Sequence, residues 1–409
     1  MTGESSRLEL LARQAQPSDS RIVLLVIDGV GDLHTAAQPR TALEKARLPN
    51  LDALARRSAL GRLVPVAPGI TPGSGPGHLA LFGYDPTCPE ADIGRGVLEA
   101  LGLELEVRPG DLAIRGNFAT ADASGNLIDR RAGRPPNEEC RRLCEKLQAA
   151  VADLDHPEVR VTAGEGHRFV LILRGRELST EVSDTDPQKT GVPPLAPVAR
   201  TPGAASTAAS LAEVIRRLEA AIADEPKANR VLLRGISTLP ELPKLTELYR
   251  LRAGAFAGYP LYRGVAAICG MEVVPCGKQL GEIVARVRDH WERFDFFFLH
   301  VKQTDQAGED GDLDAKVEVL EEVDAALPAL LDLAPAVLAV TGDHSTPAPM
   351  RSHSWHPVPL LLHSSLCFVD DSQEFTETAA LQGHLGTIRS SELMGLLLAN
   401  AGRLAKFGA

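Results

Sequence analysis

A serine able to act as a nucleophile stands in a stretch rich in glycine and proline. Residues 68–86 read PGITPGSGPGHLALFGYDP, with Ser74 at the centre of the small residues. Glycine lets the backbone turn tightly and come close to a ligand. The apolar run that follows predicts a buried helix, whose free N–H groups and dipole would favour an anion or an ionised hydroxyl near Ser74. The alternative is an ordinary loop in which the serine caps the helix.

Carboxylates and imidazoles follow three long apolar runs of the kind found in buried parallel strands. They are Asp28 after 21–27, Asp305 after 293–301, and Asp343 with His344 after 334–340. If these strands are parallel neighbours, their carboxyl ends meet at one sheet edge, where open α/β sheets bind ligands. We expect Ser74 and His353 to join them there. Each residue taken singly could instead cap a turn or hold a loop.

This set of side chains indicates metal-dependent chemistry. Carboxylate oxygens mixed with imidazole nitrogens suit Mn, Zn or Mg rather than Cu(I) or an iron–sulfur cluster. Two divalent ions could lower the pKa of a serine hydroxyl, hold a phosphoryl group and stabilise both the attacking and the leaving oxygen. The residues therefore favour phosphoryl transfer through a phosphoserine.

The alternation of strands and helices places these residues on a doubly wound α/β core. Within the chain the sequence pattern changes to one typical of an α+β domain. It predicts short strands at 103–107, 113–120, 159–163, 168–173 and 229–234. We interpret this part as an insertion, because the alternation of the core resumes after it. The predicted organisation is a polar arm over 1–20, a catalytic domain over 21–88 and 240–409, and an inserted domain over 89–239.

Composition narrows the class of protein. The length of 409 residues suggests two or three domains, and the net charge of −11 argues against a general nucleic-acid binder. Charged side chains interrupt every apolar run near the N-terminus, so we expect neither a signal peptide nor a membrane span. The six cysteines show no zinc-finger spacing and suggest reduced thiols. We expect a cytoplasmic protein, a monomer or small homo-oligomer, that acts on a small molecule.

Several longer motifs together resemble one family. They are VIDGVGD, TPGSGPGHLALFGYDP, RGNFAT, IDRRAGR, VSDTDP, TGDHSTP and HPVP, and the likeness that they show covers nearly the whole chain after residue 20. This combination is similar to the archaeal-type branch of the 2,3-bisphosphoglycerate-independent phosphoglycerate mutases, in the alkaline phosphatase superfamily. The resemblance implies an alkaline-phosphatase-like core and interconversion of 3- and 2-phosphoglycerate, in glycolysis and gluconeogenesis, through a phosphoserine.

The same resemblance implies roles for particular residues. Asp28, Ser74, Asp343 and His344 would bind one divalent ion, with Ser74 also the nucleophile, and Asp305 and His353 would bind the other. Manganese is the first candidate, with Mg, Co or Zn as alternatives, and no organic cofactor is expected. The inserted domain would act as a lid that grips the phosphorylated substrate and excludes water. The residues expected to do so are Arg95, Arg115, Asp129, Arg130 and Arg134. Solvated surface arginines are the alternative.

Two positions depart from the family pattern. Glu309 stands where the family's D-x-x-G-H segment has a histidine ligand, and glutamate would favour the hard ions Mn and Mg. Arg263 stands in L-Y-R-G where the family has L-Y-K-G, near the transferring phosphoryl group, and keeps the charge but not the shape of lysine. These departures leave two other classes open: a metal-dependent phosphatase or other hydrolase of the same superfamily, and a catalytically impaired binding homologue.

Overall fold

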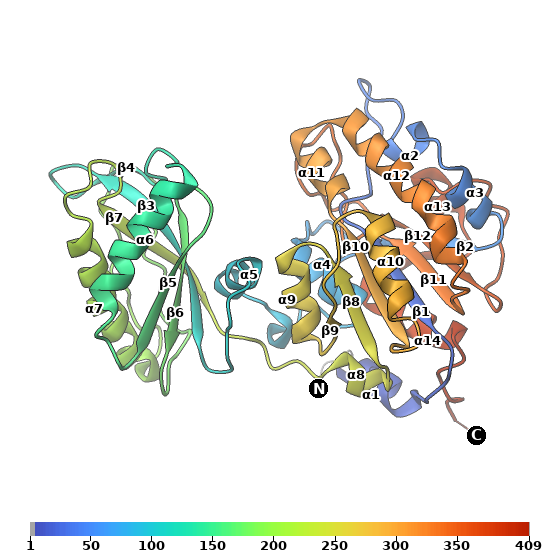
Figure 1. The fold of residues 1–409 in the computed structure, drawn as a ribbon, viewed down its shortest axis with the longest axis horizontal. Helices are drawn as coiled ribbons and strands as arrows, with labels where there is room; N and C mark the ends of the chain where they lie inside the picture. The colour runs from blue at the N-terminus through green and yellow to red at the C-terminus, as the bar shows by residue number, and fades with distance from the viewer. Residues whose placement is uncertain (1–4, 409) are drawn as a thin grey trace. The chain divides into compact units, whose positions relative to one another are not determined.

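The computed structural model describes residues 5–408, which divide into two compact units. The first unit comprises Met1–Asp92 and Glu241–Ala409, and the second comprises Ile93–Pro240. The chain therefore leaves the first unit, builds the second as one continuous segment, and returns (Figure 1).

An eight-stranded sheet forms the centre of the first unit, in the order β13-β2-β12-β11-β1-β10-β8-β9. Only β12 runs antiparallel to the other strands of this sheet. The strands are β1 (Ile22–Ile27), β2 (Ala59–Val64), β8 (Ala253–Ala257), β9 (Glu272–Val273), β10 (Phe296–Val301), β11 (Val337–Thr341), β12 (Val358–Ser364) and β13 (Gly386–Arg389). The predicted doubly wound α/β core is confirmed.

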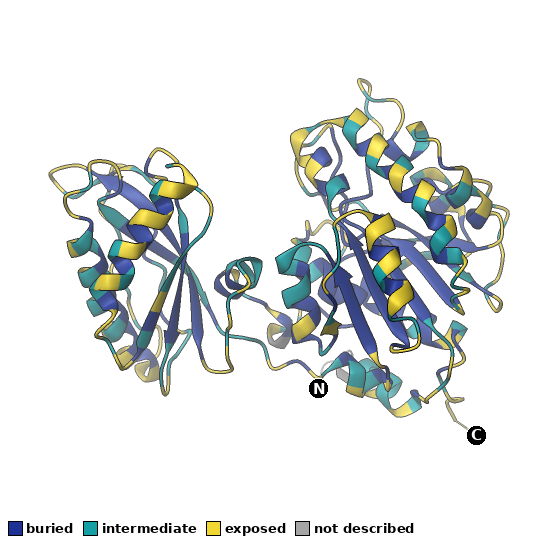
Figure 2. Ribbon diagram, viewed as in Figure 1, coloured by how far each residue is buried: buried dark blue, intermediate teal, exposed yellow. Residues whose placement is uncertain are grey.

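Every residue of β1, β10 and β11 is buried, which explains why these strands are continuous apolar runs rather than alternating ones (Figure 2). The register is direct: Ile27 pairs with Val301 on one side, and Val26 pairs with Thr341 on the other. Because the three strands are parallel neighbours in this register, the residues that follow them emerge at the same sheet edge. The predicted meeting of the three strand ends is therefore confirmed.

Helices surround this sheet. They are α1 (Ser5–Gln14), α2 (Ala42–Lys45), α3 (Pro49–Ala55), α4 (Ser74–Leu81), η1 (Pro89–Ala91), α8 (Leu245–Tyr249), α9 (Pro260–Ile268), α10 (Leu280–Asp289), α11 (Gln303–Asp310), α12 (Leu313–Leu331), α13 (Glu377–Gln382), η3 (Ser390–Glu392) and α14 (Leu393–Asn400). One core cluster joins α3, α10 and α12 to the strands, with Leu51, Ile283 and Leu327 fully buried. No helix among the described residues has the length and apolar character needed to cross a bilayer.

The second unit is an antiparallel sheet with helices. Strand β3 (Leu112–Ala121) pairs with β4 (Leu127–Asp129), β6 (Arg168–Arg174) and β7 (Arg230–Ser237), and β5 (Glu158–Ala163) pairs with β6. Two long helices, α6 (Asn137–Val151) and α7 (Ala205–Ala221), cover one face (Figure 1). The remaining elements are α5 (Arg95–Gly102) and η2 (Pro202–Ala204).

One predicted strand of this unit is wrong. Residues 103–107 alternate apolar and acidic side chains, which is the period of a strand. In the structure Leu103 is the C-cap of α5, Glu104 has a left-handed φ of 58°, and Leu105 N–H donates to Ala100 O. The segment thus begins with the turn that closes α5 and continues as irregular chain, without strand pairing.

Candidate active site

Ser74 is the first residue of α4 and follows the N-cap Gly73. The helix lies close to the loop after β11, since a Cβ added at Gly77 would meet Asp343 O at 2.6 Å. This close approach explains one glycine of the Ser74 stretch. Ser74 Oγ lies 3.3 Å from His344 Nε2, so the hydroxyl faces the predicted ligands at the helix N-terminus.

Two groups of side chains at this edge could each hold an ion. The inner cluster consists of Asp28, Asp343 and His344, all fully buried. His344 Nε2 lies 3.3 Å from Asp28 Oδ1 and 3.2 Å from Asp343 Oδ2. The imidazole nitrogen thus faces two carboxylates and the serine hydroxyl at once.

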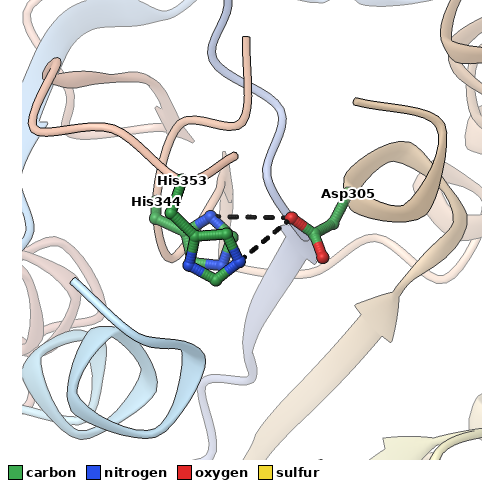
Figure 3. A group of neighbouring side chains, drawn as sticks. All are labelled: Asp305, His344 and His353. Carbon is green, nitrogen blue, oxygen red and sulfur yellow. Dashed lines mark ion pairs between the residues drawn. The ribbon is translucent and has the colours of Figure 1, made fainter. Parts of the chain in front are cut away.

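The outer cluster consists of Asp305, His344 and His353 (Figure 3). Asp305 Oδ1 lies 3.5 Å from His353 Nε2 and 3.9 Å from His344 Nδ1, and the two imidazole rings stack with centroids 3.7 Å apart. His353 Nδ1 is 3.0 Å from Pro72 O, an acceptor, so Nδ1 carries the proton and leaves the Nε2 lone pair facing Asp305. This bond also fixes His353 to the loop before Ser74.

Three neighbouring groups that the sequence did not single out hold the inner carboxylates. His300 Nε2 donates to Asp28 Oδ2 at 2.9 Å, and His78 Nδ1 lies 3.2 Å from Asp343 Oδ2. Lys302 Nζ lies 3.4 Å from Asp28 Oδ2 and forms an ion pair with Asp305. Burial alone would raise the pKa of Asp28, but the His300 hydrogen bond and the Lys302 charge outweigh it and hold that pKa well below its usual range.

The inner cluster fits a divalent cation. Asp28 Oδ1 is buried, yet it accepts no hydrogen bond from the residues that the structure describes. A buried carboxylate oxygen without a donor is costly unless a cation occupies the position it faces. Hard oxygen ligands combined with imidazole match Mn, Mg, Zn or Co.

Glu309 extends the outer cluster. Its Oε1 lies 3.6 Å from His353 Nε2, and its side chain is 54% exposed, in contrast to the buried Asp305. Both acids lie on α11, one turn apart, which places their carboxylates on one face of the helix. Glutamate therefore stands within reach of an ion held by His353 and Asp305.

Arg263 occupies a different position from Lys302. Arg263 lies on α9, and its charge acts on the Cys276 thiol after β9: burial raises the pKa of that thiol to about 11, and the Arg263 charge opposes the rise. Lys302, at the end of β10, contacts two of the metal-ligand candidates, Asp28 and Asp305. The sequence could have indicated a role for Lys302, because this residue directly follows the buried strand β10.

A second candidate site lies in the second unit. A pocket of about 400 Å³ is lined by Asn117, Glu165, Gly166 and His167 together with six arginines, which are Arg115, Arg130, Arg131, Arg134, Arg168 and Arg234. Arg115 and Asn117 alternate along β3 with Ile114 and Phe118 of the core, so the pocket opens on the sheet face opposite α6 and α7. Such a concentration of guanidinium groups is suited to an anion with several oxygens.

The predicted substrate residues fall into two groups. Arg115, Arg130 and Arg134 line the pocket, whereas Arg95, at the start of α5, lies outside its lining. Asp129 accepts hydrogen bonds from the N–H groups of Arg131 and Gly133, so it shapes the turn that carries the arginines.

Sequence reasoning missed Arg131, Arg168, Arg234 and His167 of this pocket, although RRAGR is visible as a basic run. Burial lowers the pKa of His167 to about 4, and the surrounding arginines contribute to that lowering. The imidazole is therefore neutral at pH 7 in the free protein.

The fold and the first unit's clusters define a class: α/β enzymes that gather carboxylates and imidazoles around a serine for metal-dependent transfer or hydrolysis. Within it, residues 55–228 match the family described as 2,3-bisphosphoglycerate-independent phosphoglycerate mutase. The chain belongs to this family, because close relatives match it over nearly its whole length.

Relatives that carry the name probable 2,3-bisphosphoglycerate-independent phosphoglycerate mutase include the following two. The protein of Thermus thermophilus is 50% identical over 403 residues, 98% of this chain and 99% of its own length. That of Deinococcus radiodurans is 46% identical over 411 residues, 99% and 100% of the two chains.

Two solved structures are also similar. The cofactor-independent phosphoglycerate mutase of Thermoplasma acidophilum has a TM-score of 0.75 at 30% identity, over 94% of this chain and all of that chain. The PH0037 protein of Pyrococcus horikoshii has a TM-score of 0.79 at 29% identity, over 96% and 100%. The family resemblance drawn from the motifs is thus confirmed.

Proposed function

We propose that this protein interconverts 3-phosphoglycerate and 2-phosphoglycerate without 2,3-bisphosphoglycerate, through a phosphoserine at Ser74. The observation that carries the proposal is the position of the Ser74 hydroxyl, 3.3 Å from His344 Nε2, a nitrogen that also faces Asp28 and Asp343. A serine held against two carboxylates and an imidazole is placed to bind an ion and to act as a nucleophile. Family membership supports the substrate.

The two clusters support the metal roles. Asp28, Ser74, Asp343 and His344 are assigned to one divalent ion, and Asp305, Glu309 and His353 to the other. Three carboxylates besides Glu309 favour a hard ion, and we assign manganese first. When bound, such ions lower the pKa of a hydroxyl and stabilise the charge of a transferring phosphoryl group.

The chain's own residues perform the remaining tasks. The N-terminus of α4 favours negative charge on Ser74 Oγ and on phosphate oxygens beside it. His78 Nδ1 also lies 2.8 Å from Ser74 O, so it holds the serine backbone while it contacts Asp343. Lys302 supplies a positive charge next to Asp28 and Asp305. A phosphoserine formed here returns its group to the other glycerate hydroxyl.

The arginine pocket of the second unit supports a phosphorylated, carboxylate-bearing small molecule as the ligand. We assign Arg115, Arg130 and Arg134 to its binding, and the lid role expected for residues 89–239 remains part of this proposal. The same proposal gives the protein a place in the small-molecule metabolism of the cytoplasm, which agrees with six cysteines free of disulfides.

The experiment is Ser74→Ala in manganese-loaded protein, assayed with an enolase couple and for release of inorganic phosphate. We expect isomerisation in the wild type and a loss of at least about 10³-fold in the variant, since removal of a nucleophile abolishes its covalent pathway. The matched control is Ser58→Ala, a buried serine whose Oγ donates to Leu54 O at 2.6 Å, away from the clusters. Phosphate release faster than isomerisation would select a hydrolase, and an unchanged rate in Ser74→Ala would overturn the mechanism.

A further inference from the structure

A single hydroxyl links the two clusters. Thr346 Oγ1 is fully buried, donates to Asp305 Oδ1, and lies 3.0 Å from His344 Nδ1. Because a threonine hydroxyl has one proton and gives it to the carboxylate, it can only accept from the imidazole. His344 therefore carries its proton on Nδ1, and its Nε2 lone pair faces Asp28, Asp343 and Ser74.

The backbone of Thr346 is fixed by several independent contacts. The fully buried Lys316 donates from Nζ to Thr346 O at 2.9 Å, to Gly29 O at 2.9 Å and to Gly31 O at 3.1 Å. Thr346 N–H also donates to Gly31 O at 3.1 Å. One ammonium group thus joins the loop after β1, which carries Asp28, to the loop after β11, which carries His344.

Glycines surround the threonine closely. A Cβ added at Gly29 would lie 2.6 Å from Thr346 Oγ1, and one added at Gly308 would lie 2.3 Å from Thr346 O. Real Cβ atoms do not approach so closely, so both positions require glycine for this packing. The side chain consequently has little freedom to turn its hydroxyl away from Asp305 and His344.

We propose that Thr346 is a positioning residue that fixes the tautomer of His344 and orients Asp305, so that one hydroxyl couples the geometry of the two metal sites. Hydrogen bonds to metal ligands of this kind typically change metal affinity about 10- to 100-fold when removed. This inference rests on the metal-dependent function proposed above.

Three variants separate the hydroxyl from the packing of the methyl group. Thr346→Val keeps the shape and loses the hydroxyl, Thr346→Ser keeps the hydroxyl and loses the methyl, and Thr346→Ala loses both. Thr341→Val is the matched control, since Thr341 is equally buried and its Oγ1 donates to Pro359 O at 2.9 Å rather than to a ligand candidate. Metal affinity is measured by Mn²⁺ titration with electron paramagnetic resonance, and ligand geometry by the visible absorption of the Co²⁺ form.

We expect two Mn²⁺ ions per chain in the wild type, in Thr346→Ser and in Thr341→Val. We expect binding about 10- to 100-fold weaker, with an altered Co²⁺ spectrum, in Thr346→Val and Thr346→Ala. If Thr346→Val fails to fold, the comparison of Thr346→Ser with Thr346→Ala carries the same test. Wild-type affinity and spectrum in the variants that lack the hydroxyl would overturn the positioning role alone. A wild-type protein that binds fewer than two ions would overturn the proposed function as well.

Discussion

Asp186 holds Arg130 through two parallel hydrogen bonds, with Oδ1 2.9 Å from Nε and Oδ2 2.6 Å from Nη2. Arg234 Nη1 lies 3.6 Å from the same Oδ2. The Asp186 carboxylate is 1% exposed, so it acts from beneath the arginine pocket rather than within it. One buried acid thereby orients two of the guanidinium groups that the proposed substrate would meet.

Substitution of Asp186 by Asn removes the charge and one acceptor oxygen. We expect KM for phosphoglycerate to rise about 10- to 100-fold with kcat nearly unchanged, because charge-assisted hydrogen bonds contribute about 1.5–3 kcal/mol. The control is Asp111→Asn in the same unit, where the Asp111 carboxylate accepts two hydrogen bonds from Arg174 in a similar arrangement, at 3.0 and 2.8 Å. If Asp111→Asn raised KM as much as Asp186→Asn, the effect would come from a general loss of stability and not from the orientation of the pocket arginines.

Asp186 also shows what a sequence does not reveal. The motif VSDTDP was recognisable, but its acid meets an arginine 56 residues earlier only because the sheet brings them together. By contrast, the convergence of Asp28, Asp305 and Asp343 was predictable. Continuous apolar strands that alternate with helices are typical of a parallel sheet, and parallel strands have their carboxyl ends at one edge.

The groups that support the clusters escaped prediction for a related reason. His78 and His300 lie inside apolar runs, where a histidine is expected to be a core residue. Thr346 is expected from the sequence to be a small polar residue of a loop. Their functions arise from contacts across more than one element, such as His300 of β10 with Asp28 after β1. The strand predicted at 103–107 failed differently, because five alternating residues are too few to distinguish a strand from the irregular chain that follows α5.

Glu309 is expected to set the metal preference of the outer cluster. Glu309→His replaces a hard oxygen with an imidazole nitrogen beside His353, so affinity should move from Mn²⁺ towards Zn²⁺ and Co²⁺. Glu309→Gln should weaken Mn²⁺ binding about tenfold by removing the charge. Calorimetric titration of each ion into metal-free protein measures both effects. Asp310→Asn, on the same helix, is the control. Identical ion preferences in all four proteins would exclude Glu309 from the site.

Removal of metal is expected to lower thermal stability. Without ions, burial and the charge of Asp28 both act to raise the pKa of Asp343, although its contact with His78 helps to hold that pKa below its usual value. Mn²⁺ at a hundred times its dissociation constant should add about 2.7 kcal/mol per site to the free energy of unfolding. Scanning fluorimetry with chelator and with Mn²⁺ should show a rise of several degrees, and Asp28→Asn should show a smaller one. Coincident melting curves for the wild type would contradict ion binding.

Glu377 is expected to make the protein less stable as the pH rises. Its carboxylate accepts hydrogen bonds from Asp32 N–H at 3.0 Å and from Thr41 Oγ1 at 2.7 Å, yet burial raises its pKa to about 7. The folded protein then binds more protons than the unfolded chain between the ordinary pKa of 4.5 and about 7. The free energy of unfolding must therefore fall across that window and level off above it.

The size and origin of this fall can be measured by urea unfolding between about pH 4.5 and 8 in wild type and Glu377→Gln. A shift of this size corresponds to a loss of about 3 kcal/mol in the wild type relative to the variant. Both proteins contain the same cluster carboxylates. The contributions of these groups therefore cancel in the difference between the two free energies of unfolding. Glu374→Gln, three residues before Glu377 and exposed, controls for the loss of one charge.

The Gln side chain has one acceptor oxygen, and its NH2 group can only donate. Glu377→Gln therefore loses one of the two hydrogen bonds and should be less stable than the wild type at the acid end of this range. Its stability relative to the wild type should then rise with pH up to about 7 and level off above that value. Parallel pH profiles would show that Glu377 is already ionised in the folded protein at the acid end, with the Lys316 charge among the interactions that hold it so.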